Sequence, residues 1–442
     1  MKSISALFVR IFEFAMPDPY VFAVGLTLLT ALLAAFFAPH HGLIEILGAW
    51  YKGIFDILSF ALEMILILVT GYALADSRPI RAGLDALASI PKTTRSAVVV
   101  TFLTSALACW LNWGFGLVVA GLLARAIARR MRVDFGWLVA AAYSGFLFWA
   151  SGLSSSIALA QATSGSKLNI VQALTGTVLP LSATIFTRFN LVPVLVLLVV
   201  LPFIFLALEP RGEDVVTGSV AESSSLDEEP AAPTLASRLD RAWILNLALV
   251  AGGAIYFGNA LIRGTLSLDI NGVIFIFFLL GLLLHWTPLA YVRAIERAAR
   301  ITGPLLIQYP LYGGIMGMMT GTGLAGVIAA GFVAFSTAAT LPFWSYISSI
   351  VISLFVPSGG GHWAVQGPFV VPAAAKLGAS QGASAMAVAI GEEVANMIQP
   401  FWCLPVLAVA GIGLRRVMAF TAIVFFAALV IYGASLLLLI PR

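Results

Sequence analysis

Two short stretches interrupt long apolar runs of this sequence and combine residue types that could bind an ion. Asn112–Gly116 reads Asn-Trp-Gly-Phe-Gly, and Pro357–Trp363 reads Pro-Ser-Gly-Gly-Gly-His-Trp. Glycine and proline are poor helix formers, so both stretches should break the helices that contain them. A helix start presents N–H groups that attract anions, and a helix end presents carbonyl groups that attract cations. We therefore predict a binding site where these two stretches meet.

Small polar residues continue this pattern in the apolar run that follows each stretch. Ser151–Ser156 reads Ser-Gly-Leu-Ser-Ser-Ser, and Gln399 lies in the run after the second stretch. Such residues could contact a bound molecule through side-chain or freed backbone groups. Ser151–Ser156 could equally serve close helix packing. The candidate substrate contacts are Asn112, Trp113, Gly114, Ser154, Ser155, Ser358, Gly359, Gly360, Gly361, His362 and Gln399.

Ionisable side chains inside apolar runs are candidates for binding a proton or a metal cation. Glu392 and Glu393 are adjacent, so they point to different faces of a helix, and we expect Glu392 to face the site. His362 is the only one of the four histidines within a predicted break, although it could instead be a satisfied hydrogen-bonding group. The amide of Asn396 lies nearby in the sequence. The candidate ion-coupling residues are therefore Glu392, Asn396 and His362.

Two kinds of cation fit these residues, and the sequence leaves both open. A proton could be carried by Glu392 or His362. A sodium ion could be held by oxygen atoms of Asn112, Ser154 and Asn396. No HExxH motif occurs, and the two cysteines are far apart, so we expect no metal centre and no other cofactor.

The composition shows what must position these residues. Hydrophobic residues make up 61% of the 442 residues, charged residues only 10%, and the mean hydropathy is +1.02. Soluble domains are about half apolar and a quarter charged, so these values exclude an ordinary soluble domain. The length leaves room for about ten membrane-spanning helices of roughly 20 residues. No basic face interleaved with aromatic residues exists, so we expect no nucleic-acid partner.

The apolar runs predict the elements of an all-α, polytopic membrane protein. Two runs, 95–130 and 341–376, are too long for one crossing, and each contains one of the predicted breaks. We expect each of them to form a re-entrant helical hairpin. Single spans are predicted near 19–38, 54–75, 137–160, 186–208, 242–262, 268–286, 302–331, 384–410 and 417–440.

Basic residues predict the orientation of these spans. With the N-terminus in the cytoplasm and neither hairpin crossing the membrane, 18 of the 24 lysines and arginines fall on the cytoplasmic side. If either hairpin crossed, the next basic cluster would lie outside. We therefore expect a multi-pass protein of the cell's inner, cytoplasmic membrane. Ser3–Met16 should form an interfacial helix before the first span rather than a cleaved signal peptide.

The same order of elements occurs twice and predicts an internal repeat. Residues 1–208 form the first repeat and 268–442 the second. Between them, 209–241 is a cytoplasmic linker that holds eight of the 20 acidic residues, and 242–267 contains a connecting span. This extra span starts the second repeat on the opposite side of the membrane. Inverted-topology repeats with broken transmembrane helices are typical of secondary transporters.

Enzymatic functions find little support in the sequence. Gly152-Leu-Ser154-Ser155 lacks the closing glycine of a GxSxG motif, and no P-loop occurs. A passive anion channel could use the same polar breaks. An intramembrane hydrolase would need Ser154 or Ser358 as its nucleophile, with a base beside it.

Several motifs together resemble the short-chain fatty acid transporter family of the broader ion transporter superfamily. The resemblance covers nearly the whole chain, and its most specific stretch is Val356–Phe369. The motifs are Pro17-Asp-Pro19, Asn112–Val119, Val356–Trp363, Gln366–Phe369, Gly391-Glu392, Asn396-Met397 and Gln399–Trp402. Glu63 and Glu393 stand where a neutral amide is expected, so the resemblance assigns neither of them to the site.

Membership of this family implies uptake of small monocarboxylates such as butyrate or acetoacetate, by symport with H⁺ or Na⁺. The wider superfamily implies a homodimer with a scaffold and a moving transport domain. We expect the substrate carboxylate to lie between the two hairpin tips, held by Ser358, His362, Asn112 and backbone N–H groups. Aromatic residues near the tips, Trp113 and Trp402 among them, would surround its short chain.

Overall fold

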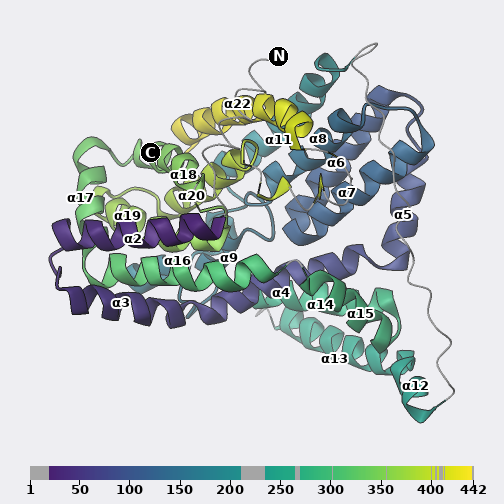
Figure 1. Cartoon of the computed structure of the whole chain (residues 1–442), viewed down its shortest axis with the longest axis horizontal. Coiled ribbons are helices and arrows are strands. Elements are labelled where there is room, and N and C mark those ends of the chain that lie inside the picture. The colour runs from purple at the N-terminus through teal and green to yellow at the C-terminus, as the bar shows by residue number, and fades with distance from the viewer. Residues whose placement is uncertain are drawn as a thin grey trace.

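Helices are the only regular elements in the part of the chain that the structure describes (Figure 1). This structure is a computed structural model, which describes residues 19–210, 234–263, 269–300, 302–354, 356–399, 401–403, 406–407, 412 and 414–440. The expected interfacial helix Ser3–Met16, the start of the Pro17–Pro19 motif, most of the linker and Pro400 lie outside these residues. The expected all-α membrane fold is confirmed.

The first half of the chain contains one helical hairpin, formed by α6 and α7, and one broken helix, formed by α8, η1 and α9. Its elements are α2 (Pro19–Phe37), α3 (Leu43–Asp56), α4 (Leu58–Ala75), α5 (Arg78–Ala88), α6 (Thr94–Leu111), α7 (Trp113–Arg130), α8 (Phe135–Ser144), η1 (Gly145–Phe148), α9 (Ser156–Ala162), α10 (Ile170–Thr175), η2 (Leu181–Ala183) and α11 (Arg188–Ala207).

The second half follows a similar order, with a hairpin of α18 and α19 followed by α20, which ends inside the protein. The elements of this half are α12 (Leu235–Asp240), α13 (Trp243–Ile262), α14 (Ile270–His285), α15 (Pro288–Ala299), α16 (Gly303–Gly321), α17 (Leu324–Phe335), α18 (Leu341–Ser353), α19 (Gly359–Leu377), α20 (Gln381–Ala395) and α22 (Leu414–Leu438). The inverted orientation of the two halves across a membrane stays a prediction.

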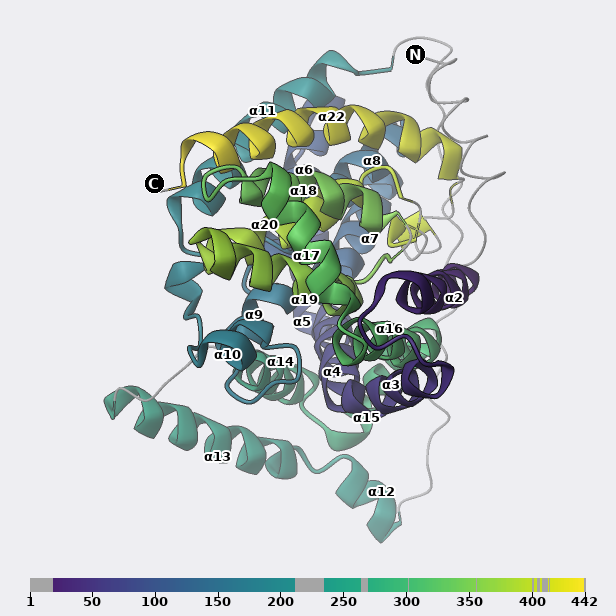
Figure 2. The same cartoon turned by 90° about the vertical axis from the view of Figure 1, so that its left-hand side faces the viewer.

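Five helical segments of the described residues are long and apolar enough to cross a membrane. They are Leu43–Ala75, Thr94–Leu111, Arg188–Ala207, Trp243–Ile262 and Arg416–Leu438. A sixth possible crossing is the pair Leu305–Gly321 and Leu324–Phe335, which is bent by 75°. Helix α13 lies at the edge of the molecule and α11 and α22 run together at the opposite edge (Figure 2).

Two predicted spans differ from the helices that the structure shows. The span expected from residue 54 begins at Leu43, because α3 and α4 run on with a helical backbone at Ile57. Lys52 and Asp56 interrupt the apolar pattern in the sequence, but the segment Leu43–Ala75 continues past both of them. The span expected over 302–331 is bent instead, since Gly323 adopts a left-handed backbone at φ 81°.

Glycines let α3 and α16 lie against each other along most of their lengths (Figures 1 and 2). A Cβ atom on Gly53 would lie 2.8 Å from the Cα of Gly317 and would also overlap the carbonyl oxygen of Gly313. These are backbone atoms, which cannot rotate away. Small residues at such contacts allow close packing where no hydrophobic effect drives helices together.

We expect Gly53→Ala to destabilise the protein by about 1–3 kcal/mol, because the added methyl group forces α3 and α16 apart. Gly48→Ala, in the same helix, is the matched control, since a Cβ atom there meets nothing within 4 Å. Thermal unfolding in detergent, followed by size-exclusion chromatography, measures the difference. Equal melting temperatures for the two variants would show that the α3–α16 contact contributes little.

Candidate functional site

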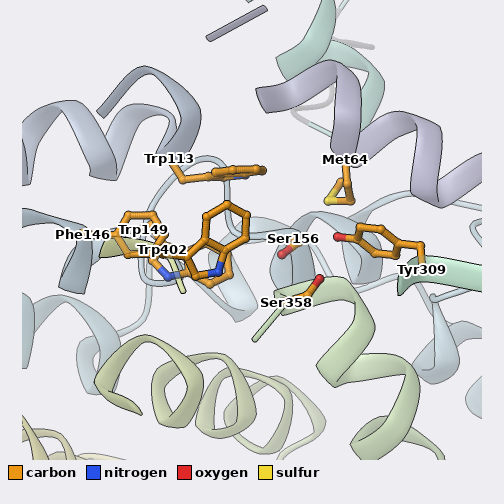
Figure 3. A pocket seen from close by; sticks show the side chains of 9 residues that line it. Met64, Trp113, Phe146, Trp149, Ser156, Tyr309, Ser358 and Trp402 are labelled. Atoms are coloured by element: carbon orange, nitrogen blue, oxygen red, sulfur yellow. The ribbon is translucent and has the colours of Figure 1, made fainter. Parts of the chain in front are cut away.

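A narrow cavity lies where the two hairpins, the first broken helix, α4 and α16 come together (Figure 3). Its interior accommodates only about one water molecule. The lining residues are Met64, Trp113, Phe146, Trp149, Ser156, Tyr309, Ser358, Gly359 and Trp402. Tryptophan and phenylalanine rings gather at one end, and the hydroxyl groups of Ser156, Ser358 and Tyr309 gather at the other (Figure 3).

The start of α19 supplies hydrogen-bond donors at the hydroxyl end of the cavity. Ser358 precedes the helix with an extended backbone, yet its side chain does not cap the helix. The N–H groups of Gly359, Gly360 and Gly361 belong to the first turn, where no carbonyl of the helix can accept them. Among the described residues, the hydroxyl of Ser358 has no hydrogen-bond partner of ordinary geometry, and it lies beside Tyr309. This end of the cavity is suited to an anion.

The three glycines of the second tip allow it to approach three other elements. A Cβ atom on Gly359 would overlap Ser156 and Trp149 of the first broken helix. The corresponding atom on Gly360 would overlap Phe60 of α4, and that on Gly361 would overlap Tyr312 of α16. Glycine at these positions is therefore a packing requirement as well as a source of free N–H groups.

The aromatic end of the cavity is a cage of four rings from three parts of the chain. Trp113 packs edge-on against Trp402 with ring centroids 5.2 Å apart, and Phe146 stacks on Trp149 at 5.8 Å. Phe146 also contacts Trp402 at 6.0 Å. These rings bury apolar surface beside a polar end, so the cavity as a whole is amphipathic.

The tip of the first hairpin is tied to the first broken helix. The backbone N–H of Trp113 donates to the Ser154 hydroxyl at 2.9 Å. The side chain of Asn112 accepts from the N–H of Phe115 at 2.9 Å and so starts α7. The structure therefore brings Asn112, Trp113 and Ser154 together as the sequence predicted. A Cβ atom on Gly114 would lie 2.8 Å from the Leu68 carbonyl oxygen, so this glycine is a packing residue.

Three other predicted residues lie behind the residues that line the cavity. Ser155 caps α9 by accepting from Ala158 N at 3.4 Å. Asn396 accepts from Trp149 Nε1 at 3.0 Å and donates to Gln399 Oε1 at 3.2 Å. Gln399 in turn donates to the Ser353 carbonyl at 2.9 Å. None of these three side chains lines the cavity.

His362 lies inside the second hairpin and does not line the cavity. Its Nε2 atom is 2.6 Å from Gln366 Oε1, one turn further along α19, and 3.2 Å from the Ser349 hydroxyl. Gln366 donates to the Ser345 carbonyl at 2.9 Å, which orients its oxygen towards the imidazole. The Nδ1 atom of His362 has no partner among the described residues. The imidazole therefore orders α18 and α19 rather than facing a cavity-bound anion.

The two adjacent glutamates of α20 have opposite surroundings, although both are fully buried. Glu393 accepts from Ala150 N at 3.0 Å, from Ser151 N at 2.9 Å and from the Ser151 hydroxyl at 2.5 Å. Both carboxylate oxygens of Glu392 lack a hydrogen-bond partner in the described part of the chain. An isolated carboxylate cannot be held in such surroundings without a proton or a bound cation. Glu392 is therefore a candidate for binding one of them.

We expect Glu393→Ala to destabilise the protein by about 3 kcal/mol or more, because it leaves buried N–H groups of the first broken helix without an acceptor. Glu393→Gln should lose less, since its amide oxygen can still accept from Ala150 and Ser151. Unfolding in detergent measures both, with the exposed Glu296→Ala as control. An alanine variant as stable as the wild type would contradict this role.

The sequence did not indicate several residues of the site. Met64, Phe146 and Tyr309 line the cavity from apolar helices, and Trp149 lines it from the break after η1. Nothing in the sequence distinguishes these four residues from packing residues. The bond between Glu393 and Ser151 joins residues 242 positions apart. In the sequence, the only indication of this contact was that both residues lie beside a predicted helix break. No group of three or more His, Cys, Asp or Glu residues that could hold a metal ion occurs in the described residues.

Comparison with known proteins places this chain in a family. A model of the short-chain fatty acid transporter family matches residues 1–439. A protein of Escherichia coli (strain K12) is 41% identical over 98% of this chain and 99% of its own length. A protein of Haemophilus influenzae is 38% identical over 95% of this chain and 96% of its own. Both are named as candidate short-chain fatty acid transporters.

A solved structure shares the fold. The crystal structure of the YdaH transporter of Alcanivorax borkumensis, which revealed an unusual topology, aligns with a TM-score of 0.59 and 18% identity. The alignment covers 95% of this chain and 98% of that one. The match of the family model over almost the entire chain, together with the two relatives, identifies this protein as a member of the short-chain fatty acid transporter family.

Proposed function

We propose that this membrane transporter takes up short-chain monocarboxylates, of the size of butyrate and acetoacetate, by symport with a cation. The observation that carries the proposal is the amphipathic cavity, whose hydroxyl and N–H donors face an aromatic cage. A short monocarboxylate has the matching shape, with a charged head and an apolar chain of a few carbons.

The carboxylate would bind at the start of α19. Ser358, Ser156 and Tyr309 offer hydroxyl groups there, and the first turn of α19 adds uncapped N–H groups. Hydrogen bonds to a charged acceptor are stronger than hydrogen bonds to a neutral one. The aromatic cage would hold the chain, where each buried methylene contributes about 0.8 kcal/mol. That modest increment predicts overlapping affinities for acids of neighbouring chain length.

The coupling cation would be a proton carried by Glu392. Moving a monoanion into a cell that is negative inside costs about 2.3 kcal/mol per 100 mV, so accumulation needs at least one cation. The carboxyl group of Glu392 has no hydrogen-bond partner within the described part of the chain, which favours a proton as the coupling cation. The oxygen atoms that could have held sodium already accept hydrogen bonds, from Phe115 to Asn112, from Trp113 to Ser154 and from Trp149 to Asn396.

Substrate entry requires movement of the second tip, because the cavity accommodates only about one water molecule. A transporter alternates between states that open to opposite sides of the membrane, whereas a passive channel forms a continuous pore. We further propose that the protein works as a homodimer in the inner membrane, with its N-terminus in the cytoplasm and its two halves inverted.

Uptake of radiolabelled butyrate into proteoliposomes tests the proposal. A proton gradient, acid outside, should drive accumulation, and a sodium gradient at equal pH should not. Accumulation driven by sodium alone would reassign the coupling ion. Preloaded unlabelled butyrate should accelerate uptake by counterflow, which a passive channel would not show. If neither gradient drives uptake and counterflow is absent, the proposed function is wrong.

A further inference from the structure

The three tryptophans of the aromatic cage differ in what their indole N–H groups do. Trp149 donates to the side chain of Asn396 at 3.0 Å, and Trp402 donates to the Pro357 carbonyl at 2.8 Å. The Nε1 atom of Trp113 is buried and has no hydrogen-bond partner among the described residues. The residue is only 6% exposed, and it lines the cavity.

An unpaired N–H group is costly in these surroundings. Buried tryptophans usually pair their N–H, and the loss of such a bond disfavours the folded state. The neighbouring rings of Trp402 and Phe146 offer no acceptor. The cavity beside Trp113 has room for only one small polar atom or water molecule. An acceptor that belongs to a bound molecule would remove the penalty.

We propose that Trp113 Nε1 donates to an oxygen on the carbon chain of the substrate, so that the cavity selects short carboxylates bearing a hydroxyl or keto oxygen over plain alkanoates of the same length. This inference rests on the proposed function, since it assumes that the carboxylate lies at Ser358 and Gly359. Trp113 then makes the second of two polar contacts, one at each end of the cavity.

The two contacts come from different hairpins, which explains how they could act together. Ser358 and Gly359 belong to the second tip, and Trp113 belongs to the first. A plain alkanoate leaves the indole N–H unpaired when the tips close around it. A substrate with an oxygen on its chain satisfies both tips at once. A site that pairs a substrate oxygen discriminates more sharply than one that only surrounds a methylene group.

The test compares four acids on the full-length protein in proteoliposomes. Butyrate, 2-hydroxybutyrate, 3-hydroxybutyrate and 4-hydroxybutyrate compete with labelled butyrate for uptake, and each inhibition constant is expressed relative to that of unlabelled butyrate. In the wild type at least one hydroxy acid should bind about tenfold more tightly than butyrate. Trp113→Phe should abolish that preference. The control is Trp402→Phe, because the N–H of Trp402 already donates to a carbonyl of the protein. This variant should bind all four acids more weakly and keep the preference.

Two results would overturn the inference. One is a wild type that binds no hydroxy acid better than butyrate, and the other is a Trp113→Phe variant that keeps the preference. If Trp113→Phe does not fold, benzothienylalanine at position 113 removes the N–H in a ring of the same shape and gives the same comparison. Labelled-butyrate uptake by the wild type is the separate test of the proposed function, so a failure of the preference alone leaves that function intact.

Discussion

Glu392→Gln is expected to abolish accumulation of butyrate against its gradient while leaving the exchange of internal for external butyrate intact. Glutamine has nearly the same shape as protonated glutamic acid but cannot release a proton. The carboxyl group is fully buried and has no partner, so its replacement breaks no hydrogen bond within the described residues. Transport of one proton with each anion adds about 1.36 kcal/mol of driving force per pH unit, or tenfold accumulation. The variant should lose that factor.

The measurement uses two assays on the same proteoliposomes. Accumulation is followed with a pH difference of one unit, and exchange is followed by counterflow at equal pH. Glu296→Gln is the matched control, because Glu296 is exposed on α15 and does not line the cavity. A Glu392→Gln variant that accumulates butyrate as the wild type does would place the proton elsewhere. Loss of counterflow as well would show that Glu392 acts on substrate binding or movement instead.

The sequence predicted the two tips correctly because their residue types are unfavourable inside a helix. Pro357 cannot continue a membrane helix without cost, and the backbone is non-helical over Val356–Ser358. The three glycines that follow form the first turn of α19. Asn112 likewise separates α6 from α7. Local chemistry of this kind is readable from one sequence, since the breaks depend on the residues that form them.

The direction in which each side chain points was less predictable. Three residues or four along a helix return to the same face, so His362 shares the face of Gln366 and turns towards Ser349 of α18. That face is inside the hairpin, whereas Ser358 lies at the cavity. The number of residues between two positions gives their relative direction, but which face meets the cavity depends on how α18, α19 and α20 pack.

Contacts between the two halves could not be predicted at all. Glu393 pairs with Ser151, and Asn396 pairs with Trp149, across more than 240 residues of chain. The aromatic cage likewise combines rings from the first hairpin, the first broken helix and the segment between α20 and α22. These contacts depend on how distant segments pack, and a single sequence does not show which segments pack together.

Gly359→Ala is expected to lower the rate of butyrate uptake at low substrate concentration by about a hundredfold, because a misplacement of roughly 1 Å at a binding site has effects of that size. The added methyl group would overlap Ser156 and Trp149, which both line the cavity. Both side chains must shift, and the cavity has room for only about one water molecule. The substituted tip should therefore fill the space that the carboxylate needs.

The same substitution should change stability much less than it changes uptake. Alanine is favoured over glycine in a helix by about 1 kcal/mol, which offsets part of the cost of overpacking. Gly326→Ala, in α17, is the matched control, since a Cβ atom there meets nothing within 4 Å. Uptake and melting temperature of both variants separate the two effects. A Gly359→Ala protein that melts normally but cannot bind butyrate places the substrate at the start of α19, whereas normal uptake would remove it from there.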